Sequence, residues 1–329
     1  MIFLLIIVLN FFFLLLYNPI KEKINLYDNP DSIRKIHKKK IPLLGGFFFL
    51  SNILTYLFYI IFFRKDLIID IFGFKSLISN IVFILSFILF FFIGYLDDKI
   101  KISAKKRLFL FIFILIVNLL IIPEIHIALI KLSFMDPFSI GIYSYFWTLL
   151  CFLLFINAFN FFDGINLQSA GLIYSICLFF LYKNIFFDFF LIIFIANCFF
   201  VYLNYQSKSF LGNNGSFYIP FLFGSLFISA YNNASNIVAE EVVILMLIPG
   251  LDLLRLFFQR IFKGINPFKA DKEHIHHYLI NKFSDIKSAF IIQLLTWVPF
   301  SISQLFGYFY LAIIIQIFFY CLIILKYKN

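Results

Sequence analysis

Residues 94–107 read GYLDDKIKISAKKR and follow residues 81–93, IVFILSFILFFFI, which contain no charged residue. The apolar segment suits the hydrocarbon of a bilayer, so Asp97 and Asp98 lie where a membrane helix reaches water. A basic flank alone could anchor this helix at an anionic membrane surface, but it does not account for two adjacent acids. Acids beside bases at a membrane face indicate a phosphate site, where a cation is bound and a proton is removed.

The composition is that of an integral membrane protein. Of 329 residues, 63% are hydrophobic and 13% are charged, a balance that keeps no soluble domain of this size in solution. The 53 phenylalanines are spread over every apolar run, and we interpret them as filling lipid-facing positions. The four cysteines lie inside apolar runs without metal-ligand spacing, so neither a disulfide framework nor a zinc site is indicated.

The apolar runs predict an all-α integral membrane protein, a polytopic bundle of about ten or eleven transmembrane helices of about 20 residues each. We expect a single domain over residues 1–329, and a retained first helix because its start lacks the pattern of a signal peptide. The expected spans are residues 1–18, 42–63, 77–95, 108–123, 141–160, 168–182, 185–203, 216–231, 238–259, 288–305 and 307–325.

Charge divides the loops between the two sides of the membrane. If the spans alternate, the loops of one side carry 22 of the 27 Lys and Arg residues. The positive-inside rule makes this side cytoplasmic, with the N-terminus outside and the C-terminus inside. The polar segments that resemble reactive sites all fall on this same side.

Two of these segments are turns. Residues 27–46 contain a basic run that ends at Lys40 and is followed by Pro42 and the Gly45-Gly46 pair, which allow a tight turn and a close approach at a helix start. Residues 209–216 read SFLGNNGS, a small-residue turn of the kind that binds anions on backbone amides. Ordinary interhelical loops use the same residues, so each turn can be either part of a binding site or a plain connection between helices.

A third segment places amides and an acid on one face of a helix. Asn157, Asn160 and Asp163 follow a spacing of three residues, and Gly164 can end the helix so that Asn166 folds back over it. Such groups are costly in a membrane unless they serve a polar site, although a hydrogen-bonded seam between helices is the alternative.

The last large loop contains three of the five histidines, His274, His276 and His277. No cysteine or second histidine pair completes a tetrahedral metal set. With Lys269 and Lys272 nearby, the cluster favours a site for a nucleotide or a diphosphate.

Taken in chain order, these segments resemble the polyprenyl-phosphate N-acetylhexosamine-1-phosphate transferases of glycosyltransferase family 4. That family includes the enzymes that start O-antigen, enterobacterial common antigen and teichoic acid synthesis. The resemblance covers nearly the whole chain and rests on five motifs: residues 28–46, the Asp97-Asp98 pair, residues 157–166, residues 212–216, and Pro267-Phe268 followed by Asp271 and His274-x-His276-His277.

The resemblance implies a multi-pass enzyme of the bacterial inner membrane, with its active site in the cytoplasm. There a UDP-N-acetylhexosamine meets undecaprenyl phosphate, and Mg²⁺, or Mn²⁺ in its place, aids transfer of the sugar 1-phosphate. By position, Asp97 and Asp98 are the implied catalytic acids. Metal ligands are implied at Asp163, Asn166 and Asn213. Substrate contacts are expected at Lys40, Arg107, Asn157, Asn160, Gly212, His274, His276 and His277. The lipid bilayer is an expected partner, nucleic acid is not, and a homodimer is left open.

Two positions depart from the family pattern. Asn213 stands where the family usually has an aspartate that binds magnesium, and Leu167-Gln168 replaces the Gly-Leu of many relatives. The form of the histidine motif favours a simple UDP-HexNAc donor over that of the peptidoglycan lipid I synthase, phospho-MurNAc-pentapeptide transferase, which has a run of adjacent histidines. A lipid-phosphate transporter would also need acidic and basic groups, and a catalytically dead relative would keep most of the motifs. The sugar epimer, the polymer that is started, and direct attack versus a covalent intermediate stay open.

Overall fold

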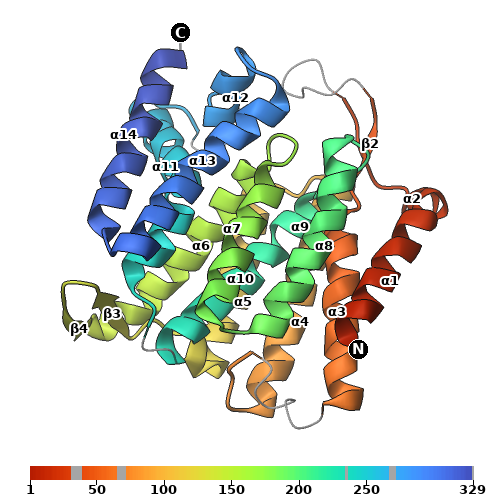
Figure 1. Cartoon of the computed structure of the whole chain (residues 1–329), viewed down its shortest axis with the longest axis horizontal. Helices are drawn as coiled ribbons and strands as arrows, with labels where there is room; N and C mark the ends of the chain where they lie inside the picture. The colour runs from red at the N-terminus through yellow and green to blue at the C-terminus, as the bar shows by residue number, and fades with distance from the viewer. Residues whose placement is uncertain (31–38, 65–71, 234–235, 267–271, 328–329) are drawn as a thin grey trace.

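The computed structural model describes residues 1–30, 39–64, 72–233, 236–266 and 272–327, which fold mainly into a bundle of α-helices (Figure 1). The α-helices are α1 (Ile2–Leu15), α2 (Tyr17–Ile24), α3 (Gly45–Phe63), α4 (Leu77–Ile100), α5 (Ala104–Ile121), α6 (Ser144–Phe162), α7 (Gln168–Lys183), α8 (Phe187–Tyr205), α9 (Asn213–Ser216), α10 (Tyr218–Asn233), α11 (Ala239–Phe262), α12 (Ile275–Ile280), α13 (Asp285–Phe306) and α14 (Phe309–Tyr327). The short elements are the 3-10 helices η2 (Pro123–Ile125) and η3 (Gly141–Tyr143) and the strands β1 (Tyr27–Asp28), β2 (Ile41–Pro42), β3 (Leu129–Leu132) and β4 (Met135–Ser139).

Each of the expected spans coincides with a helix, and the prediction of an all-α polytopic membrane protein is confirmed. Among the described residues, six helices are long and apolar enough to cross a membrane, namely α3, α4, α6, α8, α13 and α14. The pair α1 and α2, bent by 71°, would make a seventh. Of the remaining expected spans, α5 has three basic residues in its first turn, and α7 and α10 have 16 residues each.

Helix α4 continues through the acid pair, although the apolar pattern places a loop from residue 96 to 107. It is capped at its N-terminus by Ser76, whose Oγ accepts the backbone N–H of Ser79 at 3.0 Å. It ends where Lys101 adopts a left-handed conformation with φ of 55°, and α5 begins three residues later. Asp97 and Asp98 therefore have the fixed orientations of helical residues.

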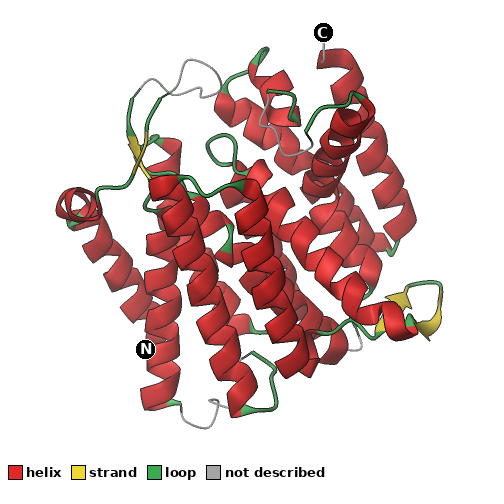
Figure 2. Cartoon of the chain, turned by 180° about the vertical axis from the view of Figure 1, so that it is seen from behind, coloured by secondary structure: helices red, strands yellow, loops and turns green. Residues whose placement is uncertain are grey.

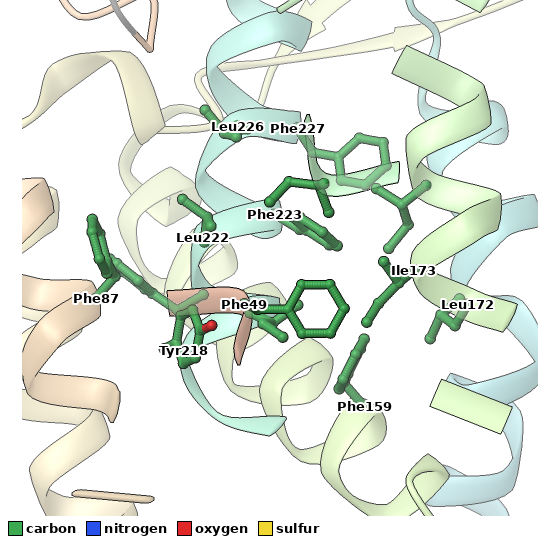
Figure 3. Packing of buried hydrophobic residues seen from close by; sticks show 14 of the residues in the cluster. Phe49, Phe87, Phe159, Leu172, Ile173, Tyr218, Leu222, Phe223, Leu226 and Phe227 are labelled. Carbon is green, nitrogen blue, oxygen red and sulfur yellow. The ribbon is translucent and has the colours of Figure 1, made fainter. Parts of the chain in front are cut away.

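Helix α10 forms the centre of the bundle. Every residue from Tyr218 to Tyr231 is buried, and side chains such as Phe49, Phe87 and Phe159 lie around it (Figure 3). The interpretation of phenylalanine as lipid-facing filler is thus wrong for much of the chain, because 21 of the described phenylalanines are buried and 18 are exposed. Aromatic rings pack as well against one another as against lipid, so composition does not distinguish the two locations.

Two small antiparallel hairpins interrupt the helices, and the sequence did not predict them (Figure 2). In the first, β1 pairs with β2 so that Tyr27 lies opposite Pro42 and Asp28 opposite Ile41. In the second, β3 pairs with β4, with Leu129 opposite Ser139. Strand β2 of the first hairpin lies at the end of the bundle where α12 lies (Figure 1).

Helix α9 is held between α3 and α4 at two glycines. A Cβ atom on Gly94 of α4 would overlap the carbonyl oxygen of Asn213, and one on Gly46 of α3 would overlap the side chain of Asn214. The backbone N–H of Gly46 also donates to the carbonyl of Leu211 at 2.9 Å. The absence of side chains at both glycines therefore lets the start of α9 reach the last turns of α4.

We expect Gly94→Ala to destabilise the protein by about 1–3 kcal/mol, because the added methyl group must displace α9. Gly250→Ala is the matched control, since a Cβ there meets nothing within 4 Å and the residue lies inside α11. The control should be neutral or slightly stabilising, by up to about 1 kcal/mol. Thermal unfolding of both variants in detergent measures the difference, and equal melting temperatures would contradict the close packing of α9.

Candidate active site

A cavity of about 850 Å³ opens at one end of the helices, and twelve of the thirteen predicted site residues line it. These twelve are Asp97, Asp98, Arg107, Asn157, Asn160, Asp163, Asn166, Gly212, Asn213, His274, His276 and His277. Lys40 is the exception, because it is exposed just before β2 and does not belong to the described lining. The structure thus brings together four motifs that are far apart in the sequence.

Asp98 is bound by the turn at the start of α9. Its Oδ1 accepts the backbone N–H of Asn213 at 3.0 Å, and its Oδ2 accepts the backbone N–H of Asn214 at 3.0 Å and the side-chain Nδ2 of Asn214 at 2.8 Å. The turn does bind an anion on its backbone amides, as its sequence suggested, and that anion is the carboxylate of Asp98. Both carboxylate oxygens of Asp98 therefore accept hydrogen bonds from the protein itself.

Asp97 has a different environment. Its Oδ2 forms an ion pair with Nη1 of Arg107 at 2.9 Å and accepts Nδ2 of Asn213 at 2.8 Å. The guanidinium group of Arg107 lies 5.2 Å from the centre of the Phe217 ring, which helps to fix it. Within the described part of the chain, Oδ1 of Asp97 has no hydrogen-bond partner, so one oxygen of the acid pair is available to a ligand.

The predicted polar stripe of α6 faces the cavity. Nδ2 of Asn160 donates to Oδ1 of Asn213 at 2.9 Å and to Oγ of Ser216 at 2.6 Å, which joins α6 to α9. Asp163 follows the last residue of α6, and burial raises its pKa to about 7, with the negative charges of Asp98 and Asp28 acting in the same direction. Carboxylates are thus concentrated on this wall of the cavity.

The segment after Asp163 contains the second departure from the family pattern. Leu167 has a φ of 67°, a left-handed conformation that is strained for leucine and natural for glycine. Oδ1 of Asn204 accepts the backbone N–H of Leu167 at 2.6 Å and stabilises this conformation. Asn166 donates from Nδ2 to Oγ of Ser207 at 2.7 Å, while its Oδ1 is buried without a partner in the described residues.

The three histidines form one wall of the cavity. The ring of His276 packs directly on Gly164, where a Cβ would overlap it. Burial lowers the pKa of His276 well below its usual value, and His277 and His274 act in the same direction. The rings of His276 and His277 have centroids 4.3 Å apart, so the cluster is compact.

Several lining residues were not among the predicted site residues. Lys99, Lys101, Arg260 and Asp285 all contribute to the cavity. The two lysines belong to residues 94–107, and their charge beside the acid pair was a usable signal. Asp285 had no distinguishing pattern, because an acid in the first turn of a helix is common.

Parts of two motifs lie outside the described residues. These are residues 31–38 of the basic run and, in the last loop, Pro267, Phe268, Lys269 and Asp271.

Fold and cavity define a multi-pass helical membrane protein with an acid- and base-lined site at one end of its helices. Residues 80–231 match the family model described as glycosyl transferase family 4. The chain is 27% identical over 297 residues to the undecaprenyl-phosphate alpha-N-acetylglucosaminyl 1-phosphate transferase of Salmonella typhi, covering 85% of this chain and 76% of the relative. The Escherichia coli K12 protein of the same name is 26% identical over 298 residues, with the same coverage. A putative UDP-N-acetylglucosamine–dolichyl-phosphate N-acetylglucosaminephosphotransferase of Sulfolobus acidocaldarius is 27% identical over 258 residues, covering 75% and 74% of the two chains. The resemblance inferred from the motifs is confirmed.

The two acids should differ in their effect on stability. In Asp98→Asn, an amide group must face the N–H donors of the α9 turn, so we expect a loss of about 1–3 kcal/mol. In Asp97→Asn, the remaining oxygen can still accept both Arg107 and Asn213, so the loss should be smaller. Melting temperatures of the two variants in detergent measure this. A larger loss for Asp97→Asn would show that Asp98 does not anchor the turn.

Proposed function

We propose that this protein transfers an N-acetylhexosamine 1-phosphate, GlcNAc or a related sugar, from a UDP-sugar to undecaprenyl phosphate and releases UMP. The reaction takes place at the cytoplasmic face of the bacterial inner membrane and starts O-antigen or another cell-surface polysaccharide. The open oxygen of Asp97, next to the Arg107 cation in the cavity, is the observation that carries the proposal. The names of the relatives from Salmonella typhi and Escherichia coli support the same chemistry.

The mechanism is a direct displacement. An oxygen of the lipid phosphate attacks the β-phosphorus of the UDP-sugar, and the bond from that phosphorus to the bridging oxygen breaks as UMP leaves. Asp97 takes the proton of the lipid phosphate on its open Oδ1 and orients the attacking oxygen. Arg107, Lys99 and Lys101 line the same cavity and offset negative charge on the phosphates.

Magnesium fits the oxygen donors of the cavity. Among the described residues, no three His, Cys, Asp or Glu side chains are grouped closely enough to hold a metal ion by themselves. Magnesium, however, is commonly bound by one or two carboxylates together with water and substrate phosphates. Asp163 and Asn166 would hold it, since Oδ1 of Asn166 is buried without a described partner, and Asn213 lines the same cavity. When bound, the cation would neutralise charge on the diphosphate.

The proposal is tested with purified protein, undecaprenyl phosphate and a panel of UDP-HexNAc donors, by measuring the release of UMP. UDP-MurNAc-pentapeptide belongs in the panel, because turnover of that donor would identify a lipid I synthase. Absence of UMP release with every donor would contradict the transferase and favour a transporter or a catalytically dead relative.

We expect Asp97→Asn to lower kcat by about 10²–10⁴, the usual contribution of a general base. The protein should still insert and remain folded, because the amide can keep the contacts with Arg107 and Asn213. Initial rates of UMP release measure the effect, with melting temperature as the folding control. Activity near wild type would remove Asp97 from the reaction.

We expect Asn213→Asp to make the protein more dependent on magnesium. Nδ2 of Asn213 lies 2.8 Å from Oδ2 of Asp97, so the variant places two carboxylates in contact and should be less stable than wild type without the metal. A bound Mg²⁺ would relieve this repulsion, because affinity for hard cations rises with the charge of the ligands. A titration of melting temperature with MgCl₂, against NaCl of equal ionic strength, measures the effect. Identical magnesium dependence in both proteins would mean that residue 213 is not a ligand.

A further inference from the structure

A buried charge network lies behind the histidine wall and is centred on Asp252 of α11. Asp252 is 4% exposed and does not belong to the described lining of the cavity. Its Oδ1 accepts Nη2 of Arg255 at 2.8 Å and the hydroxyl of Tyr320 at 2.9 Å. Its Oδ2 lies 2.8 Å from Nδ1 of His274, and the backbone N–H of Ile275 also donates to the carboxylate, at 3.2 Å from Oδ1. Donors from three separate helical segments therefore converge on one carboxylate.

Arg255 extends this network to both sides of His274. Its Nε donates to the hydroxyl of Tyr320 at 2.8 Å, and its Nη2 donates to the backbone carbonyl of Glu273. The guanidinium group also lies 5.8 Å from the centre of the Tyr278 ring. Arg255 thus neutralises Asp252 and contacts the residue just before the histidine and a ring four residues after it.

The contact with Asp252 assigns the proton on one nitrogen of His274. An ionised carboxylate only accepts hydrogen bonds, so Nδ1 of His274 must be the donor. The nitrogen that remains for a ligand is Nε2, and it has no hydrogen-bond partner among the described residues. The ring is also restrained on its faces, since it is parallel to the ring of His276 at 5.4 Å and lies 5.6 Å from the ring of Phe161.

We propose that Asp252 is a positioning residue, which holds His274 with Nδ1 protonated and so presents Nε2 to the sugar nucleotide in the cavity. The role in turnover rests on the proposed function, whereas the hydrogen-bonded state of the ring does not. Asp252 acts through His274 and does not itself touch the substrate. An acid in the middle of a largely apolar helix is accounted for by this role.

The first test is a double-mutant cycle with UDP-GlcNAc as the donor. We expect Asp252→Asn to lower kcat/KM for UDP-GlcNAc, as His274→Ala does, by on the order of tenfold or more. The reason is that one amide oxygen cannot accept hydrogen bonds from all four groups that now donate to the carboxylate. KM for undecaprenyl phosphate should change much less. In the His274→Ala background, Asp252→Asn should cost little more, since its effect passes through a ring that is no longer there.

Glu241→Gln is the matched control. Glu241 is also a buried acid of α11, 1% exposed and paired with Lys183 at 2.7 Å, but it lies outside the described lining of the cavity. This control should lower the melting temperature without changing the donor KM. Tyr320→Phe removes only one hydrogen-bond donor to Asp252 and keeps the aromatic ring. This variant should remain folded and show a smaller loss of kcat/KM for UDP-GlcNAc than Asp252→Asn does.

The second test needs no turnover. In protein labelled with ¹⁵N-histidine, the ring nitrogens of His274 should show a protonated Nδ1, and the signal is assigned by its loss in His274→Gln. In Asp252→Asn the proton should shift toward Nε2, while Glu241→Gln should leave the ring signals of His274 unchanged.

Fully additive losses in the double mutant, or a ring spectrum unchanged by Asp252→Asn, would overturn the proposal. If wild type releases no UMP from any donor, the proposed function fails, and the ring spectrum still decides whether Asp252 positions His274.

Discussion

The hydrogen bonds from the start of α9 to Asp98 are the interaction on which the rest of the site depends. Helix α9 has four residues, too few to be stable without tertiary contacts. Three N–H donors on the carboxylate of Asp98, and the close contacts at Gly46 and Gly94, fix it against α3 and α4. Once α9 is fixed, Asn213 lies within hydrogen-bond distance of both Asp97 and Asn160. One partly buried carboxylate thus determines how α4, α6 and α9 meet.

The same interaction separates the roles of two adjacent aspartates. Neighbouring residues on a helix point about 100° apart, so anchoring Asp98 in α9 directs Asp97 toward Arg107 and the cavity. Asp98 uses both oxygens for structure, whereas Asp97 keeps one open. The sequence Asp-Asp gives no sign of this difference, because it follows from the position of a turn more than 100 residues away in the chain.

Much of the fold and the cavity could be predicted from the sequence, since lipid forces apolar runs into helices and excludes polar groups from the bilayer. Loops that share one side of the membrane can therefore line one cavity, as the motifs at Asp98, Asn160 and His274 do. What could not be predicted depends on tertiary contact. Helix α4 continues past residue 96 because its two acids accept hydrogen bonds from α9. Many phenylalanines are buried because they pack against other aromatic rings and not against lipid. Lys40 lies outside the described lining of the cavity, because a basic run beside a membrane does not by itself face a site.

A buried acid is not by itself sufficient evidence for a reactive site in this chain. Glu241 is as buried as any residue of the cavity wall, yet its Oε1 is paired with Lys183 at 2.7 Å and with Gln304 at 2.8 Å, and its Oε2 accepts the N–H of Val238 at 3.1 Å. Each of its oxygens is satisfied by protein, as expected for a structural group. In the cavity, by contrast, Asp97 and Asn166 each keep one oxygen without a partner among the described residues. An unpaired oxygen alone does not mark the site, because Oε2 of Glu240 is also buried without a partner in the described residues and lies outside the described lining of the cavity. The open oxygens of Asp97 and Asn166 differ because they share one cavity with Arg107 and the histidines, and this combination distinguishes the end of the bundle where a phosphate-bearing ligand can be bound.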